Sequence, residues 1–165
     1  MAKSIENLHY LKNKWTLWTH LPNETDWGLN SYKNITTFDT VEYILTLYEN
    51  LPENIIKYCM LFIMKEGITP VWEDEQNRNG GCFSYKITTQ EADEKWFDLC
   101  GKVLSETLSS KECYNTNING ISITPKKNAN VIRIWLQNNE LVNPESYNIN
   151  ITKFSTLLYK KHTND

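Results

Sequence analysis

Short segments that are either apolar or alternate between apolar and polar residues recur along the chain, and they predict β-strands. These segments occupy residues 9–20, 58–64, 68–72, 82–87, 118–124, 130–136 and 147–154. The segments 118–124 and 130–136 predict a hairpin joined through PKKNA. The sequence NRNGG at 77–81 predicts a second hairpin turn, directly before the strand at 82–87.

Two longer segments have apolar residues three and four positions apart, which is the pattern of an amphipathic helix. The first covers residues 38–51, and Asp39 with Glu42 forms a capping box at its start. The second covers residues 88–108 and has a similar box made of Thr88 and Glu91. These boxes mark the expected helix starts.

The second predicted helix has two apolar stripes, offset by about 100°. One stripe consists of Trp96, Leu99, Cys100 and Val103, and the other of Phe97, Leu104 and Leu108. If one stripe faces the sheet, the other either widens the core-facing side or stays exposed as a partner site. The periodicity alone favours the wider core.

Strands outnumber helices and follow one another around two helices, so we predict an α+β fold with a mostly antiparallel sheet. In the segment 130–136, successive side chains point to opposite faces of the sheet. The face expected to be core carries Ile132, Ile134 and Leu136. The other face, expected to be the open side of the sheet, carries Val131, Arg133 and Trp135.

The length of 165 residues indicates a single domain, 1–165, in which residues 1–8 are expected to form a flexible N-terminal tail. A formal net charge of −3 argues against a protein that coats nucleic acid through its phosphates. A site for one nucleotide stays compatible with this charge, because a few local cations suffice. The abundance of Asn, Ile and Lys indicates an AT-rich genome, as in some viruses and protists.

The four Cys residues lack the spacing of a metal knuckle, so we expect reduced, mostly buried thiols, no metal and no cofactor. The N-terminus lacks the apolar core of a signal peptide. No apolar run is long enough to span a membrane. These features predict a cytoplasmic protein without a membrane partner.

Trp72 stands directly before three acidic residues in PVWEDEQNRNGG, and a second Trp, Trp27, lies in the polar segment 21–34. A Trp on a polar loop either pins the loop closed or contacts a ligand. Taken alone, Trp27 is better interpreted as a pin, and Trp72 as a core residue next to solvated acids.

Several segments in succession resemble the eukaryotic translation initiation factor 4E family, the messenger-RNA cap-binding proteins. The similarity runs from HYLKNKWTLW through FDTVE and GITPVWEDEQNRNGG to VIRIW, over residues 9–136. The resemblance implies a curved antiparallel sheet with helices packed on its convex face and a cap site on its concave face. The chain after Trp135 is shorter than is usual in the family, so the resemblance is to a divergent, C-terminally shortened member.

The resemblance also implies the cap-binding residues. Trp27 and Trp72 would stack on the two faces of 7-methylguanine. Glu73 would bind the edge of the base, and Trp135 would touch the N7-methyl group. Methylation at N7 gives the base a delocalised positive charge that a Trp face attracts, and a carboxylate accepts the N1–H and N2–H donors together. The next two acids, Asp74 and Glu75, are expected to be solvated turn residues that can support the site.

The chain departs from the family pattern in its basic residues. Cys82 replaces an Arg, and the phosphate loop keeps only Lys126 and Lys127. We predict that Arg133, which shares a face with Trp135, supplements these two by binding phosphate or the first transcribed nucleotide. The alternative is that Arg133 pairs with a local carboxylate.

We therefore predict a non-enzymatic protein that binds 7-methylguanosine-capped mRNA and acts in translation initiation. Its partner would be an initiation factor 4G-like scaffold or helical peptide on the convex face, bound to a single copy of this chain. Leu45 stands where the family has a Trp that grips such peptides, so ordinary scaffold peptides should bind poorly. The residues expected to contact the partner are Val41, Leu45, Phe97 and Leu104.

Two other functions stay open. The first is an interaction or decoy protein of the same fold that has lost or altered its cap affinity. The second is a cap hydrolase that holds a metal with Glu73, Asp74 and Glu75. The chain lacks the longer acidic helix signature of such hydrolases, and it contains neither H-E-x-x-H nor G-x-S-x-G.

Overall fold

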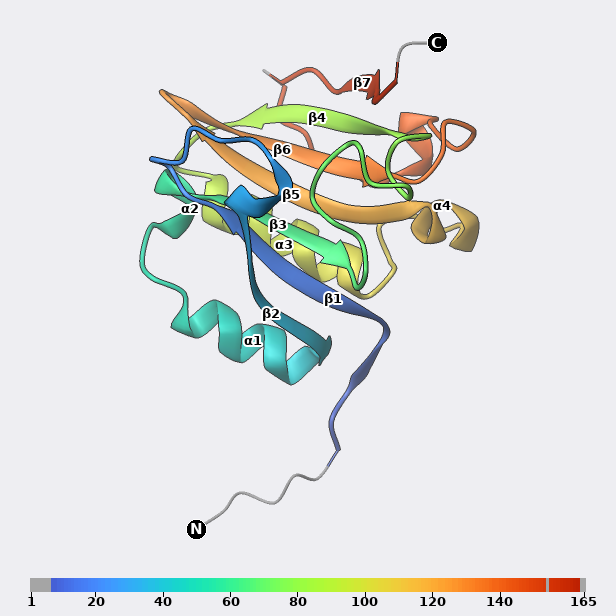
Figure 1. Cartoon of the computed structure of the whole chain (residues 1–165). Helices are drawn as coiled ribbons and strands as arrows, with labels where there is room; N and C mark the ends of the chain where they lie inside the picture. The colour runs from blue at the N-terminus through green and yellow to red at the C-terminus, as the bar shows by residue number, and fades with distance from the viewer. Residues whose placement is uncertain (1–6, 154, 164–165) are drawn as a thin grey trace.

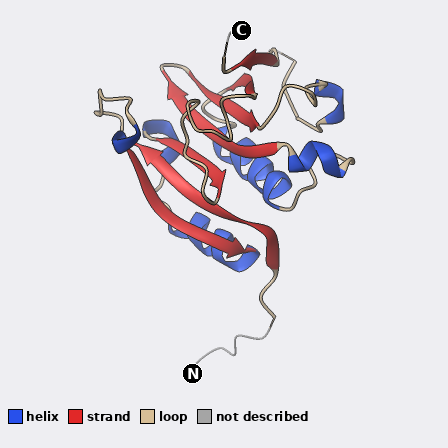
Figure 2. Ribbon diagram, turned by 45° about the vertical axis from the view of Figure 1, so that its right-hand side comes forward, coloured by secondary structure: helices blue, strands red, loops and turns tan. Residues whose placement is uncertain are grey.

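One seven-stranded sheet, in the order β2-β1-β3-β5-β6-β4-β7, carries the whole fold. The computed structural model describes residues 7–153 and 155–163. Its strands are β1 (Tyr10–His20), β2 (Tyr32–Thr40), β3 (Met60–Lys65), β4 (Gly81–Ile87), β5 (Ile118–Lys126), β6 (Ala129–Leu136) and β7 (Leu158–Lys161). Each neighbouring pair is antiparallel, and the sheet is twisted and curved (Figures 1 and 2). The predicted α+β class is confirmed.

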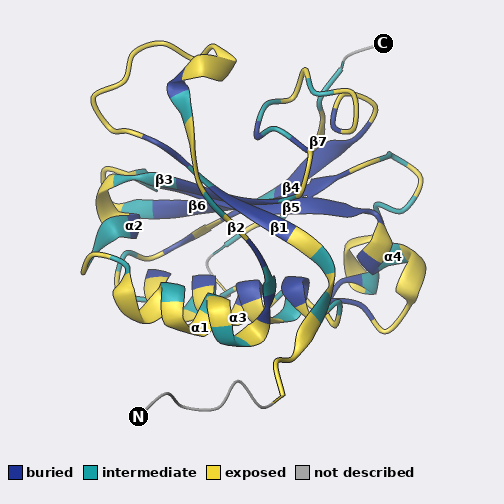
Figure 3. Ribbon diagram, turned by 60° about the horizontal axis from the view of Figure 1, so that its bottom comes forward, coloured by how far each residue is buried: buried dark blue, intermediate teal, exposed yellow. Residues whose placement is uncertain are grey.

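The helices are α1 (Val41–Asn50), α2 (Ile55–Tyr58), α3 (Ala92–Leu104) and α4 (Glu112–Thr116), with short 3-10 turns η1 (Leu29–Ser31) and η2 (Pro144–Ser146). α1 and α3 lie next to each other on one face of the sheet, which we call the convex face (Figure 3). The loop that contains η1 rises from the opposite, concave face. The two faces of the sheet are therefore covered by different kinds of structure.

Each face has its own apolar cluster. The main core lies between the sheet and α3, and it includes Trp15, Leu17, Phe83, Trp96, Ile132, Ile134 and Leu136. The smaller cluster lies on the concave face and consists of Phe62, Met64, Ile68, Cys82 and Trp135. The alternation predicted for residues 130–136 is confirmed, because Ile134 and Trp135 fall in different clusters.

Three predictions about strands are wrong. Residues 68–72 form a turn-rich loop, and no strand is present between Tyr147 and Lys153, while residue 154 lies outside the described residues. The turn at 77–81 does not close a hairpin, because β4 pairs with β6 and β7, whereas β3 pairs with β1 and β5. β2 and β7, which form the two edges of the sheet, were not predicted as strands.

The two predicted capping boxes differ in outcome. Asp39 belongs to β2, and α1 is capped by Thr40, whose Oγ1 accepts a hydrogen bond from the Tyr43 amide at 3.3 Å. The box at Asp39 is therefore wrong, because pairing with β1 extends β2 to residue 40. The second box is present: the Thr88 and Glu91 amides each bond the other residue's side chain at 3.3 Å, just before α3 begins.

Candidate functional site

Two loops cover the concave face, and each carries one of the candidate Trp residues. The first joins β1 to β2 and contains Trp27, and the second, residues 66–80, joins β3 to β4 and contains Trp72 (Figure 1). Ile68 of the second loop packs into the concave cluster beside Trp135. The β1–β2 loop and the loop 66–80 therefore both lie over the concave face.

Trp27 is held by the β1–β2 loop with one ring face covered and the rest of the ring in solvent. Its indole stacks on the buried His20 imidazole, with 4.4 Å between ring centroids and 6° between planes, yet 61% of Trp27 is exposed. His20 Nε2 lies 2.9 Å from the Asp26 carbonyl oxygen, and the Asp26 carboxylate accepts the Gly28 amide. The loop therefore presents the outer face of Trp27 to a ligand.

The loop 66–80 is ordered by two polar side chains. Asp74 accepts hydrogen bonds from the Thr69 amide and hydroxyl at 2.8 and 2.6 Å, and from the Gln76 amide at 2.9 Å. Burial opposes ionisation of Asp74, but these hydrogen bonds outweigh it and lower the pKa of the carboxyl. Asp74 is a half-buried turn residue that supports the loop, which agrees with the supporting role expected for it, whereas Glu75 is exposed and pairs with Arg78.

Asn77 is the second organiser of this loop, and it is fully buried. Its Nδ2 donates to the carbonyls of Thr69 and Val71 at 3.0 and 2.9 Å, and its Oδ1 accepts from Asn119 on β5 at 3.0 Å. These bonds fix both ends of the short segment that contains Trp72 and Glu73. Trp72 and Glu73 therefore extend into solvent from a backbone that these hydrogen bonds hold in place.

Trp72 and Glu73 are both exposed, Trp72 by 49%. The Glu73 carboxylate has no hydrogen bond or ion pair within the part of the chain that the structure describes, so it is available to a ligand. Burial raises the pKa of Tyr32, and the negative charge of Glu73 raises it further. Because Tyr32 contacts the edge of His20, Glu73 lies near the group that supports Trp27.

Trp135 lies on the concave face as predicted, but it is not open to solvent. Only 8% of Trp135 is exposed, and its Nε1 donates to the Ser122 hydroxyl at 3.0 Å. The His162 ring covers it, with 5.2 Å between centroids, and Ile68 packs in the same cluster. The expected open side of the sheet is wrong at this position, because the loop 66–80 and the segment after β7 lie over the ring.

His162 connects three parts of the site. Its Nδ1 lies 2.7 Å from the Asn77 carbonyl oxygen, and its Nε2 lies 3.1 Å from Cys82 Sγ. Burial lowers the pKa of His162 and raises the pKa of Cys82 to about 12, so both groups are uncharged near neutral pH. A neutral pair beside Trp135 does not repel a cationic ligand.

The two Gly residues that end the loop allow close backbone contacts. A Cβ at Gly80 would lie 1.8 Å from the Leu136 carbonyl oxygen, and one at Gly81 would lie 2.4 Å from the Lys160 carbonyl oxygen. The His162 amide also donates to the Gly80 carbonyl at 3.0 Å. The Gly-Gly pair is thus required where the chain enters β4 between β6 and β7.

The three cations predicted to bind phosphate lie on or beside the concave face. Lys126 ends β5, Lys127 lies in the turn to β6, and both are exposed. Arg133 is half-buried, and its Nη1 lies 3.4 Å from the Thr124 hydroxyl. Within the described residues Arg133 forms no ion pair, so the alternative of a local carboxylate partner is not supported.

The four residues predicted to contact a partner divide into two groups. Val41 and Leu45 on α1 are exposed, and Phe97 on α3 is 40% exposed and packs against Tyr48 at 4.4 Å between centroids. Leu104 is only 4% exposed and belongs to the main core. Its predicted partner role is wrong, because the second stripe of α3 is split: its C-terminal part widens the core, and only Phe97 remains at the surface.

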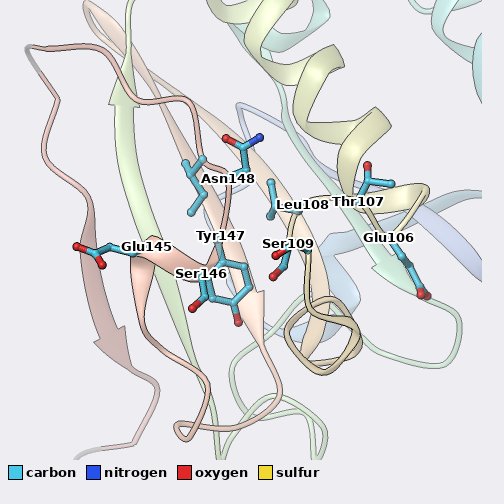
Figure 4. A pocket seen from close by; sticks show the side chains of 10 residues that line it. Glu106, Thr107, Leu108, Ser109, Glu145, Ser146, Tyr147 and Asn148 are labelled. Carbon is cyan, nitrogen blue, oxygen red and sulfur yellow. The ribbon is translucent and has the colours of Figure 1, made fainter.

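Residues of neither loop line a surface hollow of about 560 Å³ (Figure 4). The segments 106–110 and 145–149 line it, mostly with hydroxyl and amide side chains and two Glu residues. Within residues 7–153 and 155–163, no cluster of His, Cys, Asp or Glu could hold a metal ion. No helix of that same part of the chain has the length and apolar character needed to cross a membrane.

The fold matches solved cap-binding initiation factors. The complex of C. elegans eIF4E-3 with the 4E-binding protein Mextli superposes with a TM-score of 0.81 at 22% identity over 94% of both chains. Ascaris suum eIF4E-3 with m7G cap gives a TM-score of 0.80 at 21% identity, over 96% of this chain and 94% of the other. At these identities the likeness shows the fold alone.

The family follows from the sequence comparison. A family model described as "Eukaryotic initiation factor 4E" matches residues 10–164, and the chain belongs to this family. Eukaryotic translation initiation factor 4E-1B of Danio rerio is 31% identical over 138 residues, which is 80% of this chain and 63% of the relative. The Homo sapiens factor is 28% identical over 133 residues, 77% of this chain and 60% of the relative. The chain thus spans less than two thirds of these relatives.

Three residues of the site were not found from the sequence: His20, Asn77 and His162. His20 was part of a predicted strand, and its support of Trp27 depends on the fold of a loop. Asn77 and His162 are 85 residues apart, and neither belongs to a local motif. The one available signal was Cys82, which stands where the family has an Arg. The structure shows that this thiol contacts His162, so the substitution could have pointed to a different partner at that position.

Proposed function

We propose that this protein binds the 7-methylguanosine cap of mRNA on its concave face and acts in translation initiation without catalysing a reaction. The observation that carries the proposal is the pair of exposed Trp rings, Trp27 and Trp72, on two loops over one surface, with the unpaired Glu73 carboxylate beside them. Family membership and the titles of related structures with bound cap support it. The site of this activity would be the cytoplasm.

The residue types suit this ligand. Stacking of a base on an aromatic ring contributes about 1–3 kcal/mol per base. The positive charge of 7-methylguanine adds about 0.5–2 kcal/mol over a Trp face. Glu73 can accept both edge donors of the base, and the neutral His162 and Cys82 do not repel its positive charge. Unmethylated guanine lacks the charge and should bind more weakly.

The first test is titration of the intrinsic Trp fluorescence with 7-methyl-GTP and with GTP. We expect 7-methyl-GTP to bind more tightly, and Trp27→Ala or Trp72→Ala to weaken it by about 5- to 150-fold, the equivalent of about 1–3 kcal/mol. Glu73→Ala should also lose discrimination for guanine, whereas Glu75→Ala, which removes another exposed acid of the same loop, should bind like the wild type. Equal affinity of the wild type for 7-methyl-GTP and GTP would refute the proposal.

We further propose that a helical peptide of a scaffold factor binds the convex face at Val41, Leu45 and Phe97. Related structures are titled as complexes with 4E-binding proteins. The three side chains are exposed and apolar on adjoining helices, as a helix-in-groove contact requires. Because Leu45 replaces a large aromatic anchor, a generic Tyr-x₄-Leu-apolar peptide should bind weakly and a cognate one more tightly.

Calorimetric titration with such peptides tests this surface. Phe97→Ala should weaken a bound peptide, while Tyr58→Ala, which removes an exposed ring from α2, should not. Equal affinities of the two variants would exclude the convex face at Phe97. The outcome is independent of cap binding, because the two proposed sites lie on opposite faces of the sheet.

A further inference from the structure

The four strands on one side of the sheet have an unusual charge distribution. β4, β5, β6 and β7 contain five Lys or Arg residues and no Asp or Glu. The whole chain has a formal net charge of −3, so carboxylates are abundant elsewhere. A region without carboxylates in an acidic protein presents a local positive potential.

The strand register places four of these cations on the concave face. Phe83 and Tyr159 are paired across β4 and β7 and pack together in the main core, with 5.1 Å between ring centroids. The neighbouring pair, Cys82 and Lys160, must therefore point to the opposite, concave face.

The same alternation assigns the other cations of these strands. Arg133 on β6 lies opposite Ser84, and Lys86 on β4 lies opposite Val131, two positions further along. Lys126 ends the same face on β5, opposite Ala129. We call Lys86, Lys126, Arg133 and Lys160 the cationic strip.

The members of the cationic strip are available to a ligand. Lys86, Lys126 and Lys160 are exposed, and Arg133 is half-buried. Within residues 7–153 and 155–163 none of the four forms an ion pair. Their charges are thus compensated only by solvent ions, which a polyanion can release.

The cationic strip adjoins the proposed cap site. Trp135 and Cys82 are cross-strand partners, and Lys160 is the partner of Cys82 on the next strand, so the three side chains form one row across the sheet. Lys86 and Arg133 are diagonal neighbours, about 7–8 Å apart at their Cα atoms. A chain that leaves the neighbourhood of Trp135 therefore meets Lys160 across the sheet towards β7, and Arg133 and then Lys86 along β6 and β4.

We propose that the cationic strip, through Lys86 and Lys160 together with Arg133, binds the phosphates of the RNA nucleotides that follow the cap. This inference rests on the proposed cap-binding function, because it treats the strip as the continuation of that site. A single-stranded RNA suits the surface: its phosphates match cations that form no ion pair within the described residues, and it must extend from a base held between Trp27 and Trp72. The contacts would be independent of sequence, because they involve the backbone of the RNA.

The test compares three ligands: 7-methyl-GTP, a capped RNA of about ten nucleotides, and the same RNA without a cap. The variant Lys86→Gln/Lys160→Gln removes two charges of the cationic strip and keeps Arg133, Lys126 and Trp135 in place. The control Lys111→Gln/Lys161→Gln removes the same number of positive charges outside the cationic strip. Lys161 is on the other face of β7, and Lys111 precedes α4. Affinities are measured by fluorescence anisotropy or quenching at several salt concentrations.

We expect the strip variant to bind 7-methyl-GTP like the wild type but to bind capped RNA more weakly. Two lost phosphate contacts reduce the slope of log affinity against log salt by about 1.4, at about 0.7 per contact for single strands. Between about 50 and 200 mM salt, the affinity of the variant for capped RNA should then fall about sevenfold less than that of the wild type. The control should keep the wild-type slope.

Three results would overturn the inference. The strip variant could match the control on capped RNA, it could weaken 7-methyl-GTP as much as capped RNA, or the wild type could bind uncapped RNA as tightly as capped RNA. A wild type that binds no 7-methyl-GTP would instead refute the proposed function itself. The two failures are therefore distinguishable.

Discussion

The replacement of Asn77 by Ala is the sharpest test of how the loop 66–80 is held. The side chain is fully buried and makes three hydrogen bonds, to the carbonyls of Thr69 and Val71 and with the amide of Asn119. At about 0.5–1.5 kcal/mol net for each bond, the substitution should lower the free energy of unfolding by about 1.5–4.5 kcal/mol. A domain with a typical stability of about 5–15 kcal/mol stays folded after such a loss.

The same substitution should weaken cap binding, although Asn77 is not proposed to touch the ligand. Once the anchor is lost, Trp72 and Glu73 must be ordered when the ligand binds, at about 0.5–1.5 kcal/mol for each side chain. The expected loss of about 1–3 kcal/mol corresponds to a 5- to 150-fold weaker affinity for 7-methyl-GTP. Urea unfolding measures the stability, and fluorescence titration measures the affinity.

Asn79→Ala is the matched control, because Asn79 lies in the same loop, is exposed, and contributes only its backbone carbonyl to Asn139. It should leave both quantities close to those of the wild type. If Asn77→Ala loses stability but keeps the wild-type affinity, the hydrogen bonds of Asn77 do not position Trp72 and Glu73. If it loses neither, the network has no energetic role.

Three further predictions follow from individual contacts. Burial lowers the pKa of His162 below its ordinary 6.5, so the unfolded chain binds a proton more readily, and stability that is present above pH 6.5 should be lost as the pH falls. In a plot of the urea midpoint against pH, His162→Gln should flatten this fall, and parallel curves for variant and wild type would contradict the prediction. Thr40→Ala should cost about 1 kcal/mol as the loss of an N-cap, and Asp39→Ala much less; the reverse order in thermal unfolding would restore the capping box at Asp39. Gly80→Ala should destabilise the fold strongly, because its Cβ would lie 1.8 Å from a backbone oxygen, whereas Gly101→Ala, whose Cβ meets open space on α3, should stabilise it by about 0.5–1 kcal/mol. If urea unfolding shows that both variants change the free energy of unfolding in the same direction, the close approach at Gly80 is refuted.

The parts of the fold that were predictable are those in which a local period determines the structure. The alternation in β6 assigns Ile134 and Trp135 to opposite faces, and the first stripe of α3 predicts its core contacts. The edge strands were missed for a physical reason. β2 is rich in polar residues, and β7 has only four residues, so both become strands through pairing with a neighbour rather than through their own composition.

The candidate site was predictable only in part. Trp27, Trp72 and Glu73 were found because they belong to segments that resemble a family. Asn77 and His162 were missed because their roles come from contacts between distant parts of the chain. The burial of Trp135 was also mispredicted, since a period gives the direction of a side chain but not what lies above it. The burial of Leu104 agrees with the wider core that the periodicity favours, and its partner role was expected from the resemblance alone.

The course of β7 has a practical consequence for anyone who labels or immobilises this protein. β7 pairs with β4, and immediately after it the Thr163 hydroxyl lies 3.3 Å from the Arg78 carbonyl oxygen of the loop 66–80. A dye attached next to Thr163 would report on the loop 66–80, and a bulky fusion at the same place would obstruct that loop. β1 begins on the opposite side of the molecule from β7 (Figure 1), so a purification tag or surface tether belongs at the N-terminal end.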